Sequence, residues 1–412
     1  MKVVYLNPVG ALGGAERSLL DILVSVRQTM PAAQLSLVVA TPGPLIQEAE
    51  KIGVRVLLLP MPPEMAEFGD SGWIVRNSPR AKMELVCRTP RAGLAASAYV
   101  RKLRATLAAL QPDLVHTNGI KSHLLAGLAS GSTWPVIWHI RDFLSLRPVV
   151  GRLLRWAKRR ARGGIVISRA VEGDVRKTLG ALPIEMIHNA VDTHCFSPGP
   201  GAGSNLDALA GFPPAPRGTL RVGLVATFAR WKGQEVFLEA AAQFVHASPA
   251  SDVRFYIIGG PIYSTQGSQH SEFELRTKAA TLGLSSRLGL IGFHQYPAEI
   301  YRALDVVVHA STQPEPFGRT IVEAMACARP VIVSEGGGAT ELFTHEHDAV
   351  GFPIGNSAAL ARRIQELAGS PTLRARLALN ARRTAEARFD RVRLGPQILA
   401  AYRRFLHISD AA

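Results

Sequence analysis

The stretch from Gln313 to Leu342 reads QPEPFGRTIVEAMACARPVIVSEGGGATEL. It predicts a helix over RTIVEAMACA, then a short apolar strand over PVIVSE and a turn at three consecutive glycines. A helix followed by a continuously apolar strand is typical of a parallel sheet covered by helices. Two glutamates lie in the same stretch, Glu315 before the helix and Glu323 on it, so it is also a candidate functional site.

The same alternation runs along most of the chain. Apolar runs such as KVVYL, QLSLVVA, DLVHT, VIWHI and GGIVIS are separated by amphipathic stretches, and a second series begins at LRVGLVATF. The Gly- and Pro-rich stretch between the two series has the composition of a linker. The predicted fold class is α/β with two Rossmann-like doubly wound domains. The expected parts are residues 1–196, a linker at 197–219, residues 220–385, and a helical segment at 386–412 that bends at Gly395-Pro396 and leaves its own domain.

Length and composition agree with this division. The chain has 412 residues, of which 47% are hydrophobic and 19% charged, so two domains can each bury a core. No apolar stretch approaches the roughly 20 residues that span a bilayer, and the apolar part of MKVVYLNPVG is too short for a signal peptide. Cys87, Cys195 and Cys327 are odd in number and lie far apart, which favours a reducing compartment. We therefore expect a cytoplasmic protein.

Ligands of open α/β sheets bind beyond the carboxyl ends of the strands, so the loops after strands are candidate sites. In the first such loop, Gly13 and Gly14 precede a helix and let backbone N–H groups approach an anion, although a glycine pair there is more often a tight turn. In the loop ATFARWKGQE, Arg230 and Lys232 precede a helix N-terminus. Cations are disfavoured at that end of a helix unless an anion compensates, so a diphosphate ligand is favoured over a merely solvated loop.

Two more loops carry polar residues. VIWHIRDF places His139, Arg141 and Asp142 where an apolar run ends, which favours a ligand-facing loop, although a lone histidine in an apolar run is more often a satisfied core residue. In the opening stretch, Glu315 is expected to accept hydrogen bonds from sugar hydroxyls, and Glu323 to bind a ribose diol. For either glutamate alone, a surface charge near a helix end would be an adequate explanation.

Taken together, these residues resemble the retaining nucleotide-sugar glycosyltransferases of the GT-B fold, in the family that includes bacterial mannosyltransferases and sucrose-phosphate synthases. The matching motifs keep the family's order and spacing over nearly the whole chain. They are GGAER, DLVHTNGIKS, ISRAV, IHNAVDTHCFSP, VGLVATFARWKG, YIIGG, IGF, and the glutamate motif with GGGATE.

The resemblance implies two such domains facing a cleft, with the C-terminal helix crossing back to the N-terminal, acceptor-binding domain. It assigns the donor diphosphate to Arg230 and Lys232 and the ribose to Glu323. Glu315 would hold the transferred sugar, and His139 would lie beside its C6 side. Catalytic roles would thus fall to His139, Arg230, Lys232 and Glu315, and further donor contacts to backbone groups of Gly13, Gly14, Gly292, Phe293, Phe317, Gly318, Thr320 and Ile321.

The implied reaction is retaining transfer of a hexose-type sugar from a UDP- or GDP-linked donor to an acceptor hydroxyl, in cell-surface polysaccharide or glycolipid assembly. No cofactor is expected, and no metal, because the sequence has no Asp-x-Asp pair and the two cations would take the metal's place. The chain departs from the family's usual pattern in having Asp142 three positions after His139, and HNAVD where many relatives read PNGVD. The alternatives are a nucleotide-sugar 2-epimerase and a catalytically degenerate nucleotide-sugar-binding relative. A dinucleotide oxidoreductase is less favoured still, because neither half of the sequence begins with the Gly-x-Gly-x-x-Gly motif of that class.

The charge is uneven. The whole chain carries +15, and residues 1–198 hold 25 basic and 14 acidic residues, a net +11 that leaves +4 for the rest. Two runs concentrate it: Arg76–Arg104, and RLLRWAKRRAR at Arg152–Arg162 with apolar residues interleaved. No nucleic-acid motif accompanies these runs, so no nucleic-acid partner is expected. One explanation of the basic runs is a solvated helix face that only aids solubility. The other is that these residues dock the protein on the anionic inner membrane surface, which would suit a lipid-linked acceptor.

Overall fold

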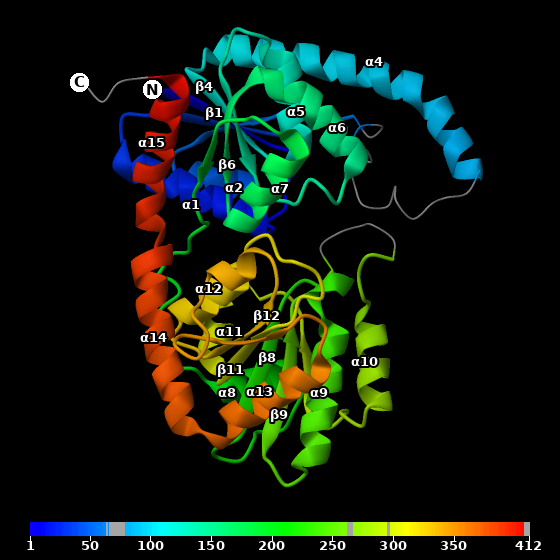
Figure 1. Cartoon of the computed structure of the whole chain (residues 1–412), viewed down its shortest axis with the longest axis vertical. Coiled ribbons are helices and arrows are strands. Elements are labelled where there is room, and N and C mark those ends of the chain that lie inside the picture. The colour runs from blue at the N-terminus through cyan, green and yellow to red at the C-terminus, as the bar shows by residue number, and fades with distance from the viewer. Residues whose placement is uncertain (63–64, 66–78, 262–266, 295–296, 408–412) are drawn as a thin grey trace. The chain divides into compact units, whose positions relative to one another are not determined.

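The computed structural model describes residues 1–62, 65, 79–261, 267–294 and 297–407, without the side chains of residues 79–92 and 204. The chain divides into two compact units, one made of residues 1–189 with 391–412 and the other of residues 190–390. Each unit is built on one parallel sheet flanked by helices, as Figure 1 shows along the chain from blue to red. The predicted α/β class with two Rossmann-like domains is confirmed. None of the described helices is both long and apolar enough to cross a membrane.

The sheet of the first unit has seven strands in the order β3-β2-β1-β4-β5-β6-β7. Its central strands are almost wholly buried, as continuous apolar runs in a parallel sheet require. The strands are β1 (Lys2–Asn7), β2 (Gln34–Val39), β3 (Arg55–Leu58), β4 (Leu114–Asn118), β5 (Val136–Ile140), β6 (Ala161–Val166) and β7 (Ile184–Met186).

The helices of the first unit connect these strands, except the last, which comes from the far end of the chain and packs on α1. They are α1 (Gly14–Thr29), α2 (Pro44–Lys51), α4 (Pro79–Leu110), α5 (Ile120–Ser130), α6 (Pro148–Ala157), α7 (Arg169–Leu179) and α15 (Leu394–Leu406), with 3-10 turns η2 (Lys158–Arg160) and η5 (Arg391–Arg393).

The helix α15 lies close against α1 at Gly395. The Gly395 N–H donates to Ser25 Oγ at 2.7 Å, and a Cβ at Gly395 would lie 2.4 Å from the Ser25 carbonyl oxygen. The predicted interruption at Gly395-Pro396 is wrong in position, because the helix breaks earlier, at Asp390, and Pro396 lies in the first turn of α15. Proline is tolerated there, since the first N–H groups of a helix have no acceptor within it.

The second unit has a six-stranded parallel sheet in the order β10-β9-β8-β11-β12-β13. Its core joins the sheet to α9 and α13 through side chains such as Phe237, Phe255 and Leu360. The elements are β8 (Leu220–Val225), β9 (Val253–Ile258), β10 (Leu288–Ile291), β11 (Val306–His309), β12 (Val331–Glu335), β13 (Val350–Pro353), α8 (Gly203–Leu209), α9 (Gln234–Ala247), α10 (Glu272–Thr281), α11 (Pro297–Ala303), α12 (Arg319–Ala326), α13 (Ser357–Gly369) and α14 (Pro371–Phe389), with 3-10 turns η3 (Arg230–Lys232) and η4 (Gly338–Glu341).

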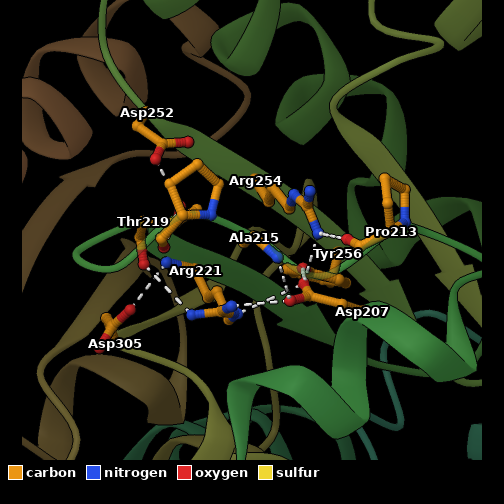
Figure 2. Close-up of polar contacts among 10 residues, drawn as sticks. Asp207, Pro213, Ala215, Thr219, Arg221, Asp252, Arg254, Tyr256 and Asp305 are labelled. Carbon is orange, nitrogen blue, oxygen red and sulfur yellow. Dashed lines mark hydrogen bonds and ion pairs between the residues drawn. The ribbon is translucent and has the colours of Figure 1, made fainter.

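The segment expected to be a linker, residues 197–219, lies within the second unit and contains α8. Asp207 on α8 is buried and joins the segment to the sheet (Figure 2). Its carboxylate pairs with Arg221 at 2.7 Å and Arg254 at 2.9 Å, and it accepts the Tyr256 hydroxyl at 2.5 Å. A Gly- and Pro-rich composition predicts irregular backbone, but it does not reveal one buried carboxylate that orders the segment.

Both sheets reverse their strand order at one point, between β1 and β4 in the first unit and between β8 and β11 in the second. The loops leaving adjacent strands diverge at such a point and open a crevice at the carboxyl edge of the sheet. The four loops singled out in the sequence all follow strands at or next to these two points, namely β1, β5, β8 and β11.

Candidate active site

In the second unit, a salt bridge joins the loops that follow β8 and β11. Lys232 Nζ lies 3.0 Å from Glu315 Oε1 and 2.7 Å from Oε2, so the ammonium grips both oxygens. Ser311 Oγ donates to Glu315 Oε2 at 2.8 Å, and His309 Nε2 lies 3.2 Å from the same oxygen. We call these four residues the Glu315 cluster.

The electrostatics of the Glu315 cluster keep its carboxylate charged. Burial by itself would raise the pKa of Glu315, but the Lys232 charge and the hydrogen bond from His309 hold that pKa well below its usual range. The Lys232 ammonium has three protons, and two of them serve Glu315, so one is left for a further acceptor. No role was predicted for His309 or Ser311. The signal that could have identified them is the pair of polar residues at the end of the apolar run DVVVHAS, residues 305–311.

The glycine run of the opening stretch holds the Glu315 backbone. Glu315 N–H donates to the Gly336 carbonyl at 3.2 Å, and Gly338 N–H donates to the Glu315 carbonyl at 2.7 Å. Gly337 has a φ of 64°, and a Cβ there would lie 2.5 Å from the Glu315 carbonyl oxygen. Glycine is therefore required at this close approach, and the turn positions a carboxylate that the helix α12 does not itself carry.

Glu323 lies on α12 and is also buried. Its Oε1 accepts from Arg319 Nε at 2.7 Å and its Oε2 from the Tyr301 hydroxyl at 2.8 Å. Burial, with the negative charge of Glu323 next, raises the pKa of Tyr301 well above its usual value, so Tyr301 is a neutral donor. Each carboxylate oxygen can accept a second bond, so Glu323 retains capacity for a diol.

Arg230 lies two residues before Lys232 in the 3-10 turn η3 but has a separate set of partners. Its Nη2 pairs with Glu274 at 2.7 Å, its Nη1 lies 3.1 Å from His270 Nδ1, and its Nε donates to the Gly267 carbonyl at 3.0 Å. These contacts use three of the five guanidinium protons, so two remain for a ligand. The structure thus brings Lys232 together with Glu315, while Arg230 is held by the segment leading into α10.

Three helices at these edges have glycine as the N-cap residue: α1 at Gly13, α9 at Gly233 and α12 at Gly318. At α1 the Glu16 carboxylate accepts the Gly13 N–H, whereas α9 and α12 have no side-chain cap. An uncapped N-terminus presents backbone N–H groups and the positive end of the helix dipole to a ligand. Thr320 lies in the first turn of α12, while the side chains of Phe317 and Ile321 are buried, which leaves only their backbone for contact. Gly14 opens α1 itself.

Gly292 and Phe293 follow β10 and are both exposed. A Cβ at Gly260, after β9, would lie 3.0 Å from the Phe293 ring, so the two loops approach each other here. The exposed Phe293 ring is an apolar surface at the carboxyl edge of the sheet, where the family resemblance implies donor contacts.

In the first unit, the carboxyl ends of β1, β4 and β5 share one buried polar network. Asn118 Nδ2 donates to Asn7 Oδ1 at 2.7 Å, and Arg141 Nε donates to Asn118 Oδ1 at 2.5 Å. Glu16 accepts from Asn7 at 3.4 Å and from the Gly13 N–H at 3.1 Å, and burial raises its pKa. His139 lies beside this network at the end of β5 and is buried.

Two other features lie outside these edges. A cavity of about 590 Å³ lies beside β13 and α13, but its lining residue Arg363 is already bonded to two others of the lining, Glu366 and His345. Across the described part of the chain, no group of three or more His, Cys, Asp or Glu side chains is placed to hold a metal ion.

Comparisons with known proteins agree with the fold. Residues 12–194 match the family model described as Glycosyltransferase Family 4, and residues 213–384 match the model described as Glycosyl transferases group 1. A D-inositol 3-phosphate glycosyltransferase of Rhodococcus opacus is 33% identical over 174 residues, which are 42% of this chain and 38% of that protein. The lipopolysaccharide core biosynthesis mannosyltransferase LpsB of Rhizobium meliloti is 30% identical over 173 residues, 42% and 46% of the two chains. The alignments thus span less than half the length of these curated relatives.

Solved structures align over nearly the whole chain. HepE of Anabaena in complex with UDP-glucose has a TM-score of 0.80 at 26% identity, covering 98% of this chain and 100% of that one. Sucrose-phosphate synthase of Thermosynechococcus elongatus has a TM-score of 0.77 at 19% identity, covering 99% and 100%, which supports the fold alone. The two family models together match most of the chain, which therefore belongs to the glycosyltransferases of family 4 and has the GT-B fold.

Proposed function

We propose that the protein is a retaining glycosyltransferase that moves a hexose-type sugar from a nucleoside-diphosphate sugar to an acceptor hydroxyl, in the assembly of a cell-surface polysaccharide or glycolipid. The observation that carries the proposal is the Glu315 cluster, which places a charged carboxylate and a lysine at the β8/β11 crevice. The complex of HepE with UDP-glucose supports a nucleotide-sugar donor, which would be UDP- or GDP-linked here.

In this proposal, Lys232 and Arg230 neutralise the diphosphate with the protons that their protein partners leave over. The uncapped N-terminus of α12 adds backbone donors, and Glu323 takes the ribose. Glu315 and the backbone of Phe317 and Gly318 hold the transferred sugar, with His139 at its C6 side. As charge develops on the departing diphosphate oxygen, the fixed cations stabilise it, so catalysis rests on positioning and electrostatics without a cofactor or a metal.

The donor is tested first, by a thermal-shift screen of UDP-, GDP- and ADP-sugars, followed by donor hydrolysis with and without EDTA. We expect one nucleotide class to stabilise the protein, slow release of sugar to water, and no loss of rate with EDTA. Proton NMR of the released sugar reads its anomeric configuration, and inversion would contradict the retaining mechanism. Lys278→Ala is the matched control for changes at Lys232, because Lys278 forms a surface pair with Glu239 in the same unit.

The partner surface in the proposal is centred on α6. Leu146, Val149, Leu153 and Trp156 are all at least half exposed. Leu146 precedes α6, and the other three lie on it at spacings of four and three residues, which align them on one side of the helix. The opposite side, with Leu154 and Ala157, is buried in the unit. Exposed Arg152, Arg159, Arg160 and Arg162 accompany the apolar side chains.

An apolar strip bordered by arginines fits an anionic lipid surface, with about 1 kcal/mol per basic residue near it. We therefore propose a cytoplasmic protein that docks on the inner face of the cell membrane and acts on a lipid-linked acceptor. The second basic run, Arg76–Arg104, lies partly outside the described residues, since Arg76 and the side chains of residues 79–92 are not described.

The structure sharpens the test of docking. Arg155 donates to the Thr178 carbonyl and Lys158 to the Leu179 carbonyl, so both hold the end of α7 and are poor probes of a lipid surface. The informative variant is Arg152→Glu with Arg159→Glu, and the matched control is Arg376→Glu with Arg383→Glu on exposed positions of α14. We expect salt-sensitive flotation with anionic vesicles that only the first pair abolishes. Absence of flotation at low ionic strength would make a soluble acceptor the better hypothesis.

A further inference from the structure

A chain of four buried aromatic side chains connects α15 to the carboxyl end of β5. The Tyr402 hydroxyl donates to the Tyr5 hydroxyl at 3.2 Å, and it lies 2.7 Å from His116 Nδ1. His116 Nε2 lies 3.1 Å from His139 Nδ1. All four side chains are at most 2% exposed. We call Tyr5, Tyr402, His116 and His139 the aromatic relay.

Both histidines of the aromatic relay are neutral. Burial, followed by the charge of Arg141, lowers the pKa of His116 to about 3 and that of His139 well below its usual value. Burial also raises the pKa values of Tyr5 and Tyr402, so both hydroxyls keep their protons. Each of the four groups therefore has one proton to donate.

The proton positions then follow from one bond. Because the Tyr402 proton is used toward Tyr5, the Tyr402 oxygen accepts at its contact with His116, and His116 carries its proton on Nδ1. His116 Nε2 is then an acceptor, so His139 must donate from Nδ1. The remaining nitrogen, His139 Nε2, is left with a bare lone pair.

That nitrogen is the exception in the relay. Among the described residues, His139 Nε2 is buried and has no hydrogen-bond partner. A buried acceptor without a donor is unfavourable, and such an atom near the carboxyl end of β5, one strand from the switch point, calls for an external donor. A hydroxyl group supplies that donor, whereas a carboxylate offers only further lone pairs.

We propose that Tyr402 and His116 are positioning residues that fix His139 in the Nδ1–H form, so that its Nε2 accepts a hydrogen bond from a hydroxyl of the transferred sugar and rejects a carboxylate at that place. The role of the sugar rests on the proposed function above; the relay itself does not. The consequence is specificity for a hexose over the corresponding hexuronic acid.

The relay is tested by NMR on the full chain labelled with ¹⁵N-histidine, with His139→Gln and His116→Gln used for assignment. Wild type is expected to show His139 protonated at Nδ1 and bare at Nε2. In Tyr5→Phe, the Tyr402 proton loses its acceptor and turns to His116 Nδ1, which reverses both histidines, so His139 becomes protonated at Nε2. In Tyr402→Phe the preference for one form is lost. Tyr99→Phe, another buried tyrosine of the same unit, is the matched control and leaves both histidines unchanged.

The sugar role is tested by comparing a UDP-hexose with the matching UDP-hexuronic acid. Because an Nε2–H donates to a carboxylate, Tyr5→Phe should lower the preference for the hexose, measured as the ratio of kcat/KM values, by about tenfold, while Tyr99→Phe leaves it unchanged. Unaltered His139 protonation in Tyr5→Phe would overturn the relay. Reversed protonation with an unchanged preference would overturn the sugar role. Reversed protonation in a protein that transfers no sugar would leave the relay standing and reject the proposed function instead.

Discussion

Each end of the β8–β13 sheet buries a carboxylate beside positively charged side chains. The two sites differ in how many such side chains surround the carboxylate and in where those side chains are attached. At the amino end, Asp207 is enclosed by Arg221, Arg254 and the Tyr256 hydroxyl (Figure 2). Both arginines come from the strands themselves, and each also donates to a carbonyl, of Thr219 and of Pro213. The partners of Asp207 are thus held in place by the strands that carry them.

At the carboxyl end, Glu315 is held by one lysine from a loop and by the side chains of Ser311 and His309. Lys232 also lies over the Trp231 ring, with Nζ 3.9 Å from its centroid, and it keeps one proton for another acceptor. Two planar guanidinium groups hold the Asp207 carboxylate in a fixed geometry. A single lysine has a flexible side chain, so its ammonium can bind Glu315 and an incoming ligand at the same time. Similar burial therefore stabilises the fold at one end, and at the other end we propose that it serves ligand binding.

The largest expected effect is on stability. Asp207→Ala leaves two partly buried arginines without their counter-charge, and we expect a loss of about 3–5 kcal/mol in the free energy of unfolding. Turnover per folded molecule should stay at the wild-type level. Urea unfolding and an active-site-normalised assay measure the two quantities. Glu272→Ala, which removes an exposed pair with Arg276, is the control and should cost at most about 1 kcal/mol.

The next effect is on catalysis. Lys232→Ala removes a charge that we assign to the leaving diphosphate, so turnover should fall at least ten- to a hundredfold, since a charged hydrogen bond is worth about 1.5–3 kcal/mol. The turnover of Arg230→Ala should fall by a similar factor. Wild-type turnover in either variant, measured beside Lys278→Ala, would remove the phosphate assignment and with it the contrast between the two ends of the sheet.

The pH dependence of stability tests the first end more finely. The hydrogen bonds and charge of the neighbouring groups, against the opposing effect of burial, lower the pKa of Asp207 to about 2 from its ordinary value of 3.8. A group with a lowered pKa stabilises the fold above its ordinary pKa and loses that contribution as the pH falls toward the lowered value. Wild type should therefore lose about 2 kcal/mol from Asp207 between pH 4 and pH 2, and Asp207→Asn should show a flatter profile over this window. An identical slope in both proteins would contradict the assignment.

The smallest effect separates the two glutamates near α12. Glu323→Ala should weaken binding of the free nucleoside diphosphate about tenfold, because it removes the acceptor proposed for the ribose. Glu315→Ala should spare that affinity and lower only sugar transfer, since it leaves the Lys232 charge available for phosphate. Isothermal titration with the nucleoside diphosphate decides the question, and equal losses in both variants would contradict the division of roles.

The sequence predicts the sheets and their loops well because apolar runs and glycine turns are local signals. The two-domain α/β fold, and the positions of Lys232 and Glu315 after strands that flank a switch point, follow from such signals. The contact between these two residues does not, because it depends on which loops the strand order brings together.

The features that sequence reasoning missed all depend on distant partners. Asp207 orders α8 through arginines on two strands of the sheet, so a local Gly- and Pro-rich composition was misleading. His116 and Tyr402 meet only because the end of the chain packs on the first unit, and a single tyrosine in a helical pattern gives no sign of it. The helix break is at Asp390, whereas the sequence pattern predicted it at Gly395-Pro396. Proline breaks a helix in its interior but is tolerated in its first turn, and the sequence does not show that Pro396 lies in the first turn of a new helix.

The membership of α15 in the first unit has a consequence for synthesis on the ribosome. Domains commonly fold in the order in which they emerge, the N-terminal one first. Here, residues 1–189 emerge without α15, so the side of α1 that receives Gly395, and the buried hydroxyl of Tyr5, have no cover until the whole of residues 190–390 has been made. The first unit to be translated is thus the last to be completed, and the nascent chain carries an open apolar face through the time needed to translate about half of the protein.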